Sequence, residues 1–418
     1  MESDTTRRRL ARTTQRLPRA RWVTLLMAVM ASACQVSTEG NLPIDSTPET
    51  VGIPLVLVSL GQGPVSSRFT SDVWMHGNTA YTGTWGNRGT TPGNAVLIWD
   101  VTGPPLLVDS VIVPLAGTTG DVQVSDDGQL LAVAIEPRPN GGLALYSLTN
   151  PRKPQLLTRY TSPNVANGVH TAEIARVNGT LYAFCSIDPA NLVPAKLVIL
   201  DLTDPSRPVE SAVLTIGSPI MHDVFVRDGL LFTAEWNDGL GIWDIGAMGG
   251  SPAQPRRLGR VATVGGKAHN VYWFNDPLTG SKRYAFVGEE GPGTIGSASS
   301  GDIHVIDVSN FAAPVEVGRY TVPGAGVHNF SMDESRGLLY AAYYNGGLRV
   351  LDIRGDLSSC PASQKSPDGR CDLERMGRVK ALLQAEPNGL VYVWGVHFSG
   401  GALYVSDMWN GLWKFSAP

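Results

Sequence analysis

Five of the seven histidines of this chain share one local setting, the start of a short segment in which apolar and polar residues alternate. They are His170, His222, His269, His328 and His397, and an apolar residue precedes each of them. Imidazole titrates near neutral pH and is a common ligand of transition metals, so grouped histidines suit metal binding or acid–base chemistry. The other two, His76 and His304, fall outside this pattern, and we expect them to be ordinary.

Acidic residues stand at or just past the end of the segment that follows these histidines. They are Glu136, Glu235, Glu289, Glu290 and Asp407. Histidine together with carboxylate is the ligand set of Zn, Fe, Cu or Mn. We therefore name as candidate metal ligands His170, His222, His269, His328, His397, Glu235 and Glu289. We assign no catalytic residue, and such a transition metal is the one cofactor that we name as a candidate.

A structural interpretation of the histidines stands beside the chemical one. Repeated units arise by duplication, so a histidine in one copy is inherited by others without a joint task. A polar side chain at this position can also bond the backbone of the neighbouring unit. Asp or Asn directly follows His222, His269 and His328, which suits such a network. Both interpretations stay open on the sequence alone.

A recurring apolar sequence motif, which in most copies contains aspartate, indicates the repeated unit that positions these residues. Seven copies lie about 50 residues apart, a period typical of stacked supersecondary units. The copies occupy residues 97–101, 145–148, 197–202, 242–245, 305–308, 350–353 and 413–416. In several copies a turn-forming residue, a proline and a second apolar run follow, as in Asp204 to Pro208 and beyond. Each copy therefore predicts a strand, a tight turn and a second strand.

The earlier half of each unit predicts another hairpin. The segment from His222 to Ala234 is the clearest, because two alternating runs flank Asp228-Gly229. Four short strands per unit, seven units and no convincing amphipathic helix predict an all-β fold, a seven-bladed β-propeller of four-stranded antiparallel blades. The first strand of each propeller blade lines the central channel. We therefore expect the five strand-initial histidines to face one another at one mouth of that channel.

The two ends of the repeat array predict how the ring closes. The last copy ends at residue 416 of 418, so the last blade lacks its outer strand. The apolar run at residues 53–60 has the outer-strand pattern and no partner of its own. We expect it to pair with the C-terminal blade, which removes open sheet edges. The propeller then spans residues 51–418.

The N-terminal segment predicts export. Residues 1–33 combine many arginines with an apolar run at 22–33 that is too short to span a bilayer, as in a signal peptide. Ala31-Ser32-Ala33-Cys34 resembles the lipobox of bacterial lipoproteins, which implies acylation of Cys34 and a membrane anchor. An ordinary signal-peptidase site would cut at the same point and release a secreted protein. Residues 34–50 then form a flexible tether.

Cysteine use is consistent with an oxidising compartment. Cys360 and Cys371 flank a polar loop within an insertion at about residues 355–377. We expect a disulfide there, as in exported proteins. The alternative is a metal-binding pair, but no further Cys or His lies nearby in the sequence. We expect Cys185 to be a small buried apolar residue.

Composition narrows the range of partners. The net charge is −4, and Asp, Glu, Lys and Arg make up 17% of residues without a basic stripe. We therefore expect no nucleic-acid partner, and we expect a monomer. The sequence contains no Gly-x-Ser-x-Gly elbow, phosphate loop or dinucleotide fingerprint.

The copies resemble the LVIVD-repeat β-propellers of secreted and cell-surface bacterial proteins. The resemblance is carried by Ile303 to Asn310, Leu197 to Pro208 and Gly346 to Asp352, and the propeller that it implies covers residues 51–418. The copies with Ser147 and Ser416 depart from the aspartate, which puts one turn bond of those blades in doubt. The resemblance implies little about function. We expect a binding or scaffold module for a protein, peptide or glycan at the cell envelope; the alternative is a metal-dependent oxidoreductase or hydrolase at the histidine-lined mouth.

Overall fold

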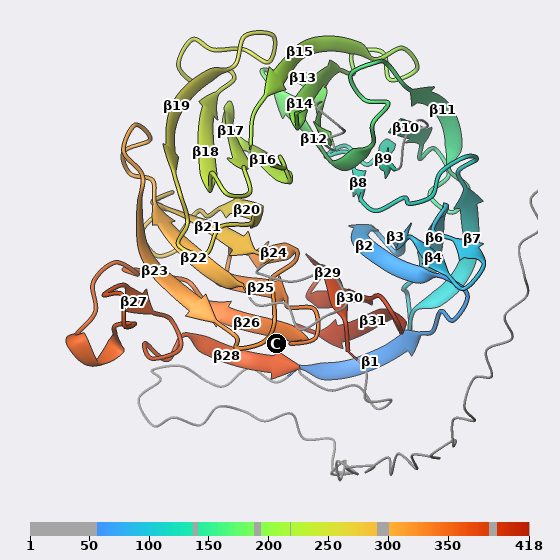
Figure 1. Cartoon of the computed structure of the whole chain (residues 1–418). Coiled ribbons are helices and arrows are strands. Elements are labelled where there is room, and N and C mark those ends of the chain that lie inside the picture. The colour runs from blue at the N-terminus through green and yellow to red at the C-terminus, as the bar shows by residue number, and fades with distance from the viewer. Residues whose placement is uncertain are drawn as a thin grey trace, which may run out of the picture. The chain divides into compact units, whose positions relative to one another are not determined.

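A computed structural model of the chain shows seven antiparallel sheets arranged as blades around a central channel (Figure 1). The structure describes residues 57–136, 141–187, 194–217, 219–290, 301–383 and 391–417. The seven-bladed propeller predicted from the repeats is thereby confirmed. The predictions for residues 1–33, for the tether at 34–50 and for Cys34 fall outside the described residues.

Each of the first four blades is one four-stranded sheet. Blade 1 consists of β2 (Phe69–His76), β3 (Thr79–Trp85), β6 (Ala95–Asp100) and β7 (Leu106–Ile112), and blade 2 of β8 (Val122–Val124), β9 (Leu130–Ile135), β10 (Gly142–Ser147) and β11 (Gln155–Tyr160). Blade 3 consists of β12 (Val169–Val177), β13 (Thr180–Ile187), β14 (Lys196–Asp201) and β15 (Val209–Thr215), and blade 4 of β16 (Asp223–Arg227), β17 (Leu230–Ala234), β18 (Leu240–Asp244) and β19 (Arg256–Val261).

The remaining blades include two departures from this pattern. Blade 5 consists of β20 (Ala268–Trp273), β21 (Tyr284–Glu289), β22 (Asp302–Asp307) and β23 (Val315–Thr321), with the short β27 (Cys371–Asp372) added at its edge. Blade 6 consists of β24 (Phe330–Asp333), β25 (Leu338–Ala342), β26 (Leu348–Asp352) and β28 (Val379–Leu383). Blade 7 consists of β29 (Val393–Ser399), β30 (Ala402–Asp407), β31 (Gly411–Ser416) and β1 (Val58–Gly63). A small hairpin, β4 (Asn87–Arg88) with β5 (Thr91–Pro92), and a 3₁₀ helix, η1 (Ala362–Gln364), lie outside the blades.

The recurring motif forms the third strand of every blade, and its aspartate stabilises the turn that follows. Asp100 Oδ1 accepts a hydrogen bond of 3.0 Å from the backbone N–H of Thr102, and later copies repeat this Asx turn. Ser147 takes over the role, because its Oγ accepts from the N–H of Thr149 at 3.3 Å. The substitution at Ser147 therefore does not remove the turn bond.

The ring closes as the sequence predicted, by pairing of an N-terminal strand with the C-terminal blade. β1 pairs antiparallel with β31, from Val58 opposite Ser416 to Gly63 opposite Leu412. The described strand begins at Val58 and ends at Gly63, so it extends past the expected end at residue 60. Residues 51–56, the first part of the predicted run, lie outside the described residues. Both chain ends thus contribute to one blade.

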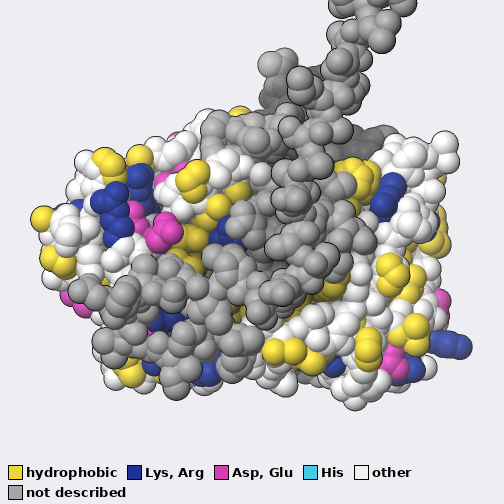
Figure 2. All heavy atoms as spheres, turned by 90° about the horizontal axis from the view of Figure 1, so that it is seen from below, with side chains coloured by type: hydrophobic (Ala, Val, Ile, Leu, Met, Phe, Trp, Pro, Cys, Tyr) yellow, Lys and Arg dark blue, Asp and Glu magenta, His cyan; other side chains and the backbone are white. Residues whose placement is uncertain are grey.

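The hydrophobic core lies between neighbouring blades. One cluster joins Phe286 and Val305 of blade 5 to Leu339 and Leu351 of blade 6, all of them fully buried. The outer strands face solvent instead, as the largely exposed β7 illustrates. On the face seen in Figure 2, hydrophobic side chains lie interspersed with charged ones, and Lys and Arg occur in small groups. The inner strands are left to line the channel.

The insertion of blade 6 docks on blade 5. Cys360 and Cys371 form a disulfide in this segment. β27 pairs parallel with β23, which places Arg370 Nε 3.0 Å from Oε1 of Glu316. The insertion therefore contributes a cation to the neighbouring blade. Among the described residues, no helix combines the length and the apolar character that crossing a membrane would require.

Candidate metal centre

Four of the five predicted histidines converge at one mouth of the central channel. His170 belongs to β12, His269 belongs to β20, and His222 and His328 lie just before β16 and β24. Together with Trp85 and Trp394 they line one continuous site. The predicted arrangement, in which the histidines face one another, therefore applies to the histidines of blades 3 to 6.

The imidazoles contact one another in series around the mouth. Ring centroids lie 4.4 Å apart for His170 and His222, 3.8 Å for His222 and His269, and 4.2 Å for His269 and His328. Trp394 continues the series at 4.4 Å from His328. Such spacing is that of rings in direct contact, so the group acts as one electrostatic unit.

Burial keeps three of these imidazoles uncharged. Removal from water lowers the pKa of His222, His269 and His328 well below the usual histidine value, and the neighbouring imidazoles lower each pKa further. Neutral imidazole is the form that ligates metal ions. The three rings are therefore in the protonation state that metal ligation requires.

Each of these three rings also presents a buried nitrogen without a hydrogen bond. Within the described part of the chain, Nδ1 of His222, of His269 and of His328 has no partner. An unsatisfied buried polar atom costs about 1–3 kcal/mol, so three at one site require an explanation. A bound ion is one physical answer.

Carboxylates complete the site. Nδ1 of His170 lies 3.0 Å from Oε1 of Glu136, and its Nε2 lies 2.9 Å from Nε2 of His222. Glu290 accepts a hydrogen bond of 2.7 Å from the hydroxyl of Tyr344. One ligand atom each from His222, His269 and Glu290 lies within 4.8 Å of the others, close enough for a single metal ion.

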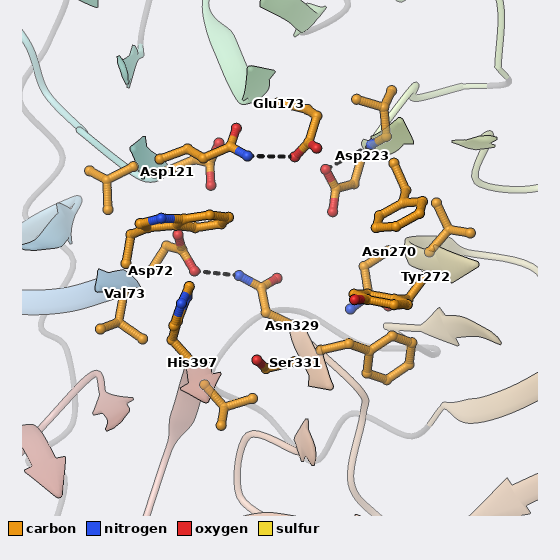
Figure 3. Close-up of a pocket in the computed structure, with 18 of the residues that line it drawn as sticks. Asp72, Val73, Asp121, Glu173, Asp223, Asn270, Tyr272, Asn329, Ser331 and His397 are labelled. Carbon is orange, nitrogen blue, oxygen red and sulfur yellow. Dashed lines mark hydrogen bonds between the residues drawn. The ribbon is translucent and has the colours of Figure 1, made fainter. Parts of the chain in front are cut away.

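The structure corrects the prediction for His397. This side chain lies in a second cavity of the channel, beside Trp74, with a ring-centroid distance of 4.6 Å (Figure 3). In blade 7 the place at the histidine-lined mouth belongs to Trp394. His397 is therefore not a ligand candidate for the same ion as the other four histidines.

Two of the predicted carboxylates also lie elsewhere. Glu235 is fully buried and pairs with Arg257, whose Nη2 donates to Oε1 at 2.9 Å. Glu289 is buried against His304, with Oε2 3.0 Å from the imidazole Nε2. A carboxylate engaged by a cation within its own blade is not available to the histidines, so neither belongs to the candidate site.

Sequence reasoning passed over the carboxylate that does reach the site. Glu290 directly follows β21, and its neighbour Glu289 is the last residue of that strand. Successive side chains of a strand point to opposite faces, so the two glutamates diverge. All residues of β21 are buried, so the sequence pattern alone did not distinguish the two glutamates. No sequence signal distinguished Trp85 or Trp394 as lining residues.

The aromatic residues at the mouth support the histidines. The ring of Trp236 stacks on His222 at 5.6 Å, and Tyr344 meets His328 edge-on at 4.9 Å. Trp236 and Tyr344 both adopt positive φ, 49° and 41°. A left-handed backbone at a bulky residue is costly and clusters at functional sites.

Comparison with known proteins identifies the repeat. Residues 193–215 and 298–322 match the LVIVD repeat, and they include the third and fourth strands of blades 3 and 5. No curated protein matches the chain. The two matched segments are thus the motif, turn and following strand of blades 3 and 5, and the chain is a β-propeller that contains LVIVD repeats.

Proposed function

We propose that the histidine-lined mouth binds a divalent transition metal ion through His222, His269 and Glu290. The observation that carries this proposal is the group of three buried neutral imidazoles whose Nδ1 atoms have no partner in the described structure. Two nitrogens and one carboxylate oxygen form a ligand set suited to Zn, Fe, Cu or Mn. A purely structural role would leave these nitrogens unsatisfied.

The neighbouring residues suit a supporting role. Metal-ligating histidines are commonly oriented by a further hydrogen bond, and His170 lies between Glu136 and His222 in that way. The hydroxyl of Tyr344 holds Glu290 from the other side. Burial raises the pKa of Glu290, and a cation close to its oxygens would favour the charged carboxylate.

The activity that follows is metal-dependent chemistry or metal-dependent binding at this mouth. A metal ion bound there would polarise a ligand oxygen or an attached water molecule. Four histidines and the tryptophans Trp85 and Trp394 would restrict what reaches the ion. An oxidoreductase or a hydrolase fits this arrangement, and capture of a peptide or glycan through the same ion fits it as well.

We also propose that the protein works outside the cytoplasm, attached to the cell envelope by lipid at Cys34 or secreted. The arginine-rich and apolar N-terminal sequence supports export. The Cys360–Cys371 disulfide supports it further, because such bonds persist in oxidising compartments.

Cobalt(II) offers a direct test of the metal site. The propeller, freed of metal by chelation and titrated with Co²⁺, is expected to bind about one ion per chain and to develop visible absorption bands. Replacing His222 and His269 together by alanine is expected to weaken binding by at least roughly a hundredfold, since two ligands are lost. Elemental analysis of the protein as purified gives the native ion.

His397→Ala serves as the matched control. It removes a histidine of the same kind of strand, but one that lies in the other cavity. Binding is expected to be unchanged in this variant. Absence of Co²⁺ and Zn²⁺ binding in the parent protein, or equal binding after the double replacement, would leave the histidines as structural residues.

A further inference from the structure

The channel contains a second cavity, separate from the histidine-lined mouth, to which no role has been assigned. Its volume is about 330 Å³, and residues from the first strands of all seven blades line it (Figure 3). Asp72, Asp121 and Asn329 line both this cavity and the histidine site, so they form the boundary between the two. The cavity is large enough for a small organic molecule.

One side of this cavity is acidic. Asp72, Asp121, Glu173 and Asp223 come from four consecutive blades, and Figure 3 shows them along one arc of the wall. Among the described residues that line the cavity, none is Lys or Arg. The nearby Arg227 is occupied by Glu334, to which its Nη1 donates at 2.6 Å. The acidic arc therefore lacks a counter-charge of its own.

Only neutral groups bond these carboxylates within the cavity wall. Nδ2 of Asn329 donates to Asp72 at 2.6 Å, and Nε2 of Gln123 donates to Glu173 at 2.9 Å. Burial raises the pKa of Glu173 well above its usual value. Carboxyl groups in this state gain from a cation brought among them.

Aromatic rings form a further part of the lining. Trp74, Phe225, Tyr272, Phe330 and Phe398 contribute rings, and Phe225 and Tyr272 pack at 4.5 Å. Aromatic faces attract cations and bury apolar groups, whereas a bare metal ion gains little from them. Acidic groups along one arc and rings elsewhere suit a ligand with a charged end and an apolar body.

An unpartnered amide also faces this cavity. Asn270 is only 3% exposed, and its Oδ1 accepts from the N–H of Gly288 at 3.1 Å. Its Nδ2 has no partner among the described residues, and Figure 3 shows the side chain at the cavity beside Tyr272. This amide nitrogen is therefore open to an acceptor atom on whatever occupies the cavity.

We propose that this cavity binds an organic ammonium ion that has an aromatic or aliphatic body and a hydroxyl or carbonyl acceptor. The ammonium group lies among Asp121, Glu173 and Asp223, and the body packs against the rings. The acceptor receives the free hydrogen bond of Asn270. This site is independent of the metal centre proposed above.

Calorimetric titration with tyramine at pH 8 tests this proposal, because tyramine carries an ammonium group, a ring and a hydroxyl. The alcohol tyrosol, in which a hydroxyl replaces the amine, is the neutral matched probe, and CaCl₂ tests for a simple cation site. Tyramine is expected to bind at least about tenfold more tightly than tyrosol, as a charge-assisted contact implies. Equal binding of the two, binding of Ca²⁺ in preference to tyramine, or no tyramine binding would overturn the proposal.

Variants of the full propeller locate the site. Glu173→Gln keeps the shape of the side chain, removes its charge and is expected to weaken tyramine binding at least about tenfold. Asp204→Asn, in an exposed turn of blade 3, is the control and is expected to leave it unchanged. Trp74→Leu is expected to weaken tyramine and tyrosol alike. Thermal unfolding verifies that each variant is folded, and Co²⁺ binding by Glu173→Gln separates a failure here from a failure of the metal site.

Discussion

A chain that begins at Pro64, and so lacks β1, is expected to unfold at a clearly lower temperature than the full propeller. β1 supplies the fourth strand of blade 7 and joins the N-terminal part of the chain to the C-terminal strand β31. Leu57, just before it, is 4% exposed and packs in the cluster between blades 6 and 7. Burying one leucine contributes about 1.5–3 kcal/mol, and the hydrogen bonds of the strand add to this.

The truncated chain is also expected to self-associate. Without β1, the edge of β31 presents unpaired N–H and C=O groups, which are a template for pairing with another chain. Size-exclusion chromatography would detect this as a shift toward larger species. Differential scanning calorimetry measures the midpoint, and an unchanged midpoint would contradict the role of β1 as the closure of the ring.

Point variants separate the contribution of packing from that of the strand. Leu57→Ala removes a buried side chain and is expected to cost about 2–5 kcal/mol in the free energy of unfolding. Val58→Ala is the matched control, because this neighbouring side chain is 51% exposed. Urea unfolding is expected to shift strongly for the first variant and little for the second. Similar shifts would show that the core does not extend to residue 57.

The fold could be predicted because its signals repeat. Each blade contains the same apolar motif, and Asp100, Asp201 and Asp307 stabilise the same turn after it. A pattern that recurs seven times tolerates erosion in single copies, as at Ser147. The closing strand was predictable for a related reason, since one blade lacked a strand and one apolar run lacked a blade.

The position of a side chain along the channel was harder to predict than the fold. Gly395-Val396-His397 is identical in sequence to Gly326-Val327-His328. The strand pairing differs, because His397 pairs with Tyr404, whereas Ser331 pairs with Tyr340 at the equivalent place in blade 6. His397 is thus the equivalent of Ser331, three residues beyond His328. Short sequence similarities do not determine strand register. A small shift in register moves a side chain to another position along the channel or to the other face of the sheet.

Charge pairing inside a blade was not visible in the sequence at all. His304 lies mid-strand in β22 and was expected to be ordinary. It is fully buried, with Nδ1 2.8 Å from Oε1 of Glu316 and Nε2 3.0 Å from Oε2 of Glu289. Glu316 lies in the neighbouring strand β23 and Glu289 at the end of β21. Only the alignment of three strands brings these groups together.

Replacing His304 by leucine is expected to lower the free energy of unfolding by about 3–5 kcal/mol, because it leaves two buried glutamates without their shared cation. Arg370 of the insertion lies 3.0 Å from Glu316, but among the described residues no second cation pairs with Glu289. His76→Leu is the control, since His76 lies at a hairpin turn, and a shift below about 1 kcal/mol is expected for it. Chemical unfolding at pH 7 measures both.

The stability that His304 contributes is expected to depend on pH. Burial opposes the charged imidazole, but hydrogen bonds and the charges of Glu289 and Glu316 outweigh burial and raise the pKa of His304 to about 9. The pKa in the unfolded chain is about 6.5. A raised folded-state pKa means that the stabilisation is fully present below about pH 6.5 and is lost as the pH rises through about 9.

The parent protein is therefore expected to lose on the order of 3 kcal/mol of stability between about pH 6.5 and pH 10 from this group. His304→Gln, which cannot take up a proton, is expected to show a flatter profile over the same range. Subtracting the two profiles removes the contribution of other titrating groups. Parallel profiles would mean that His304 is neutral in the folded protein and would contradict the prediction.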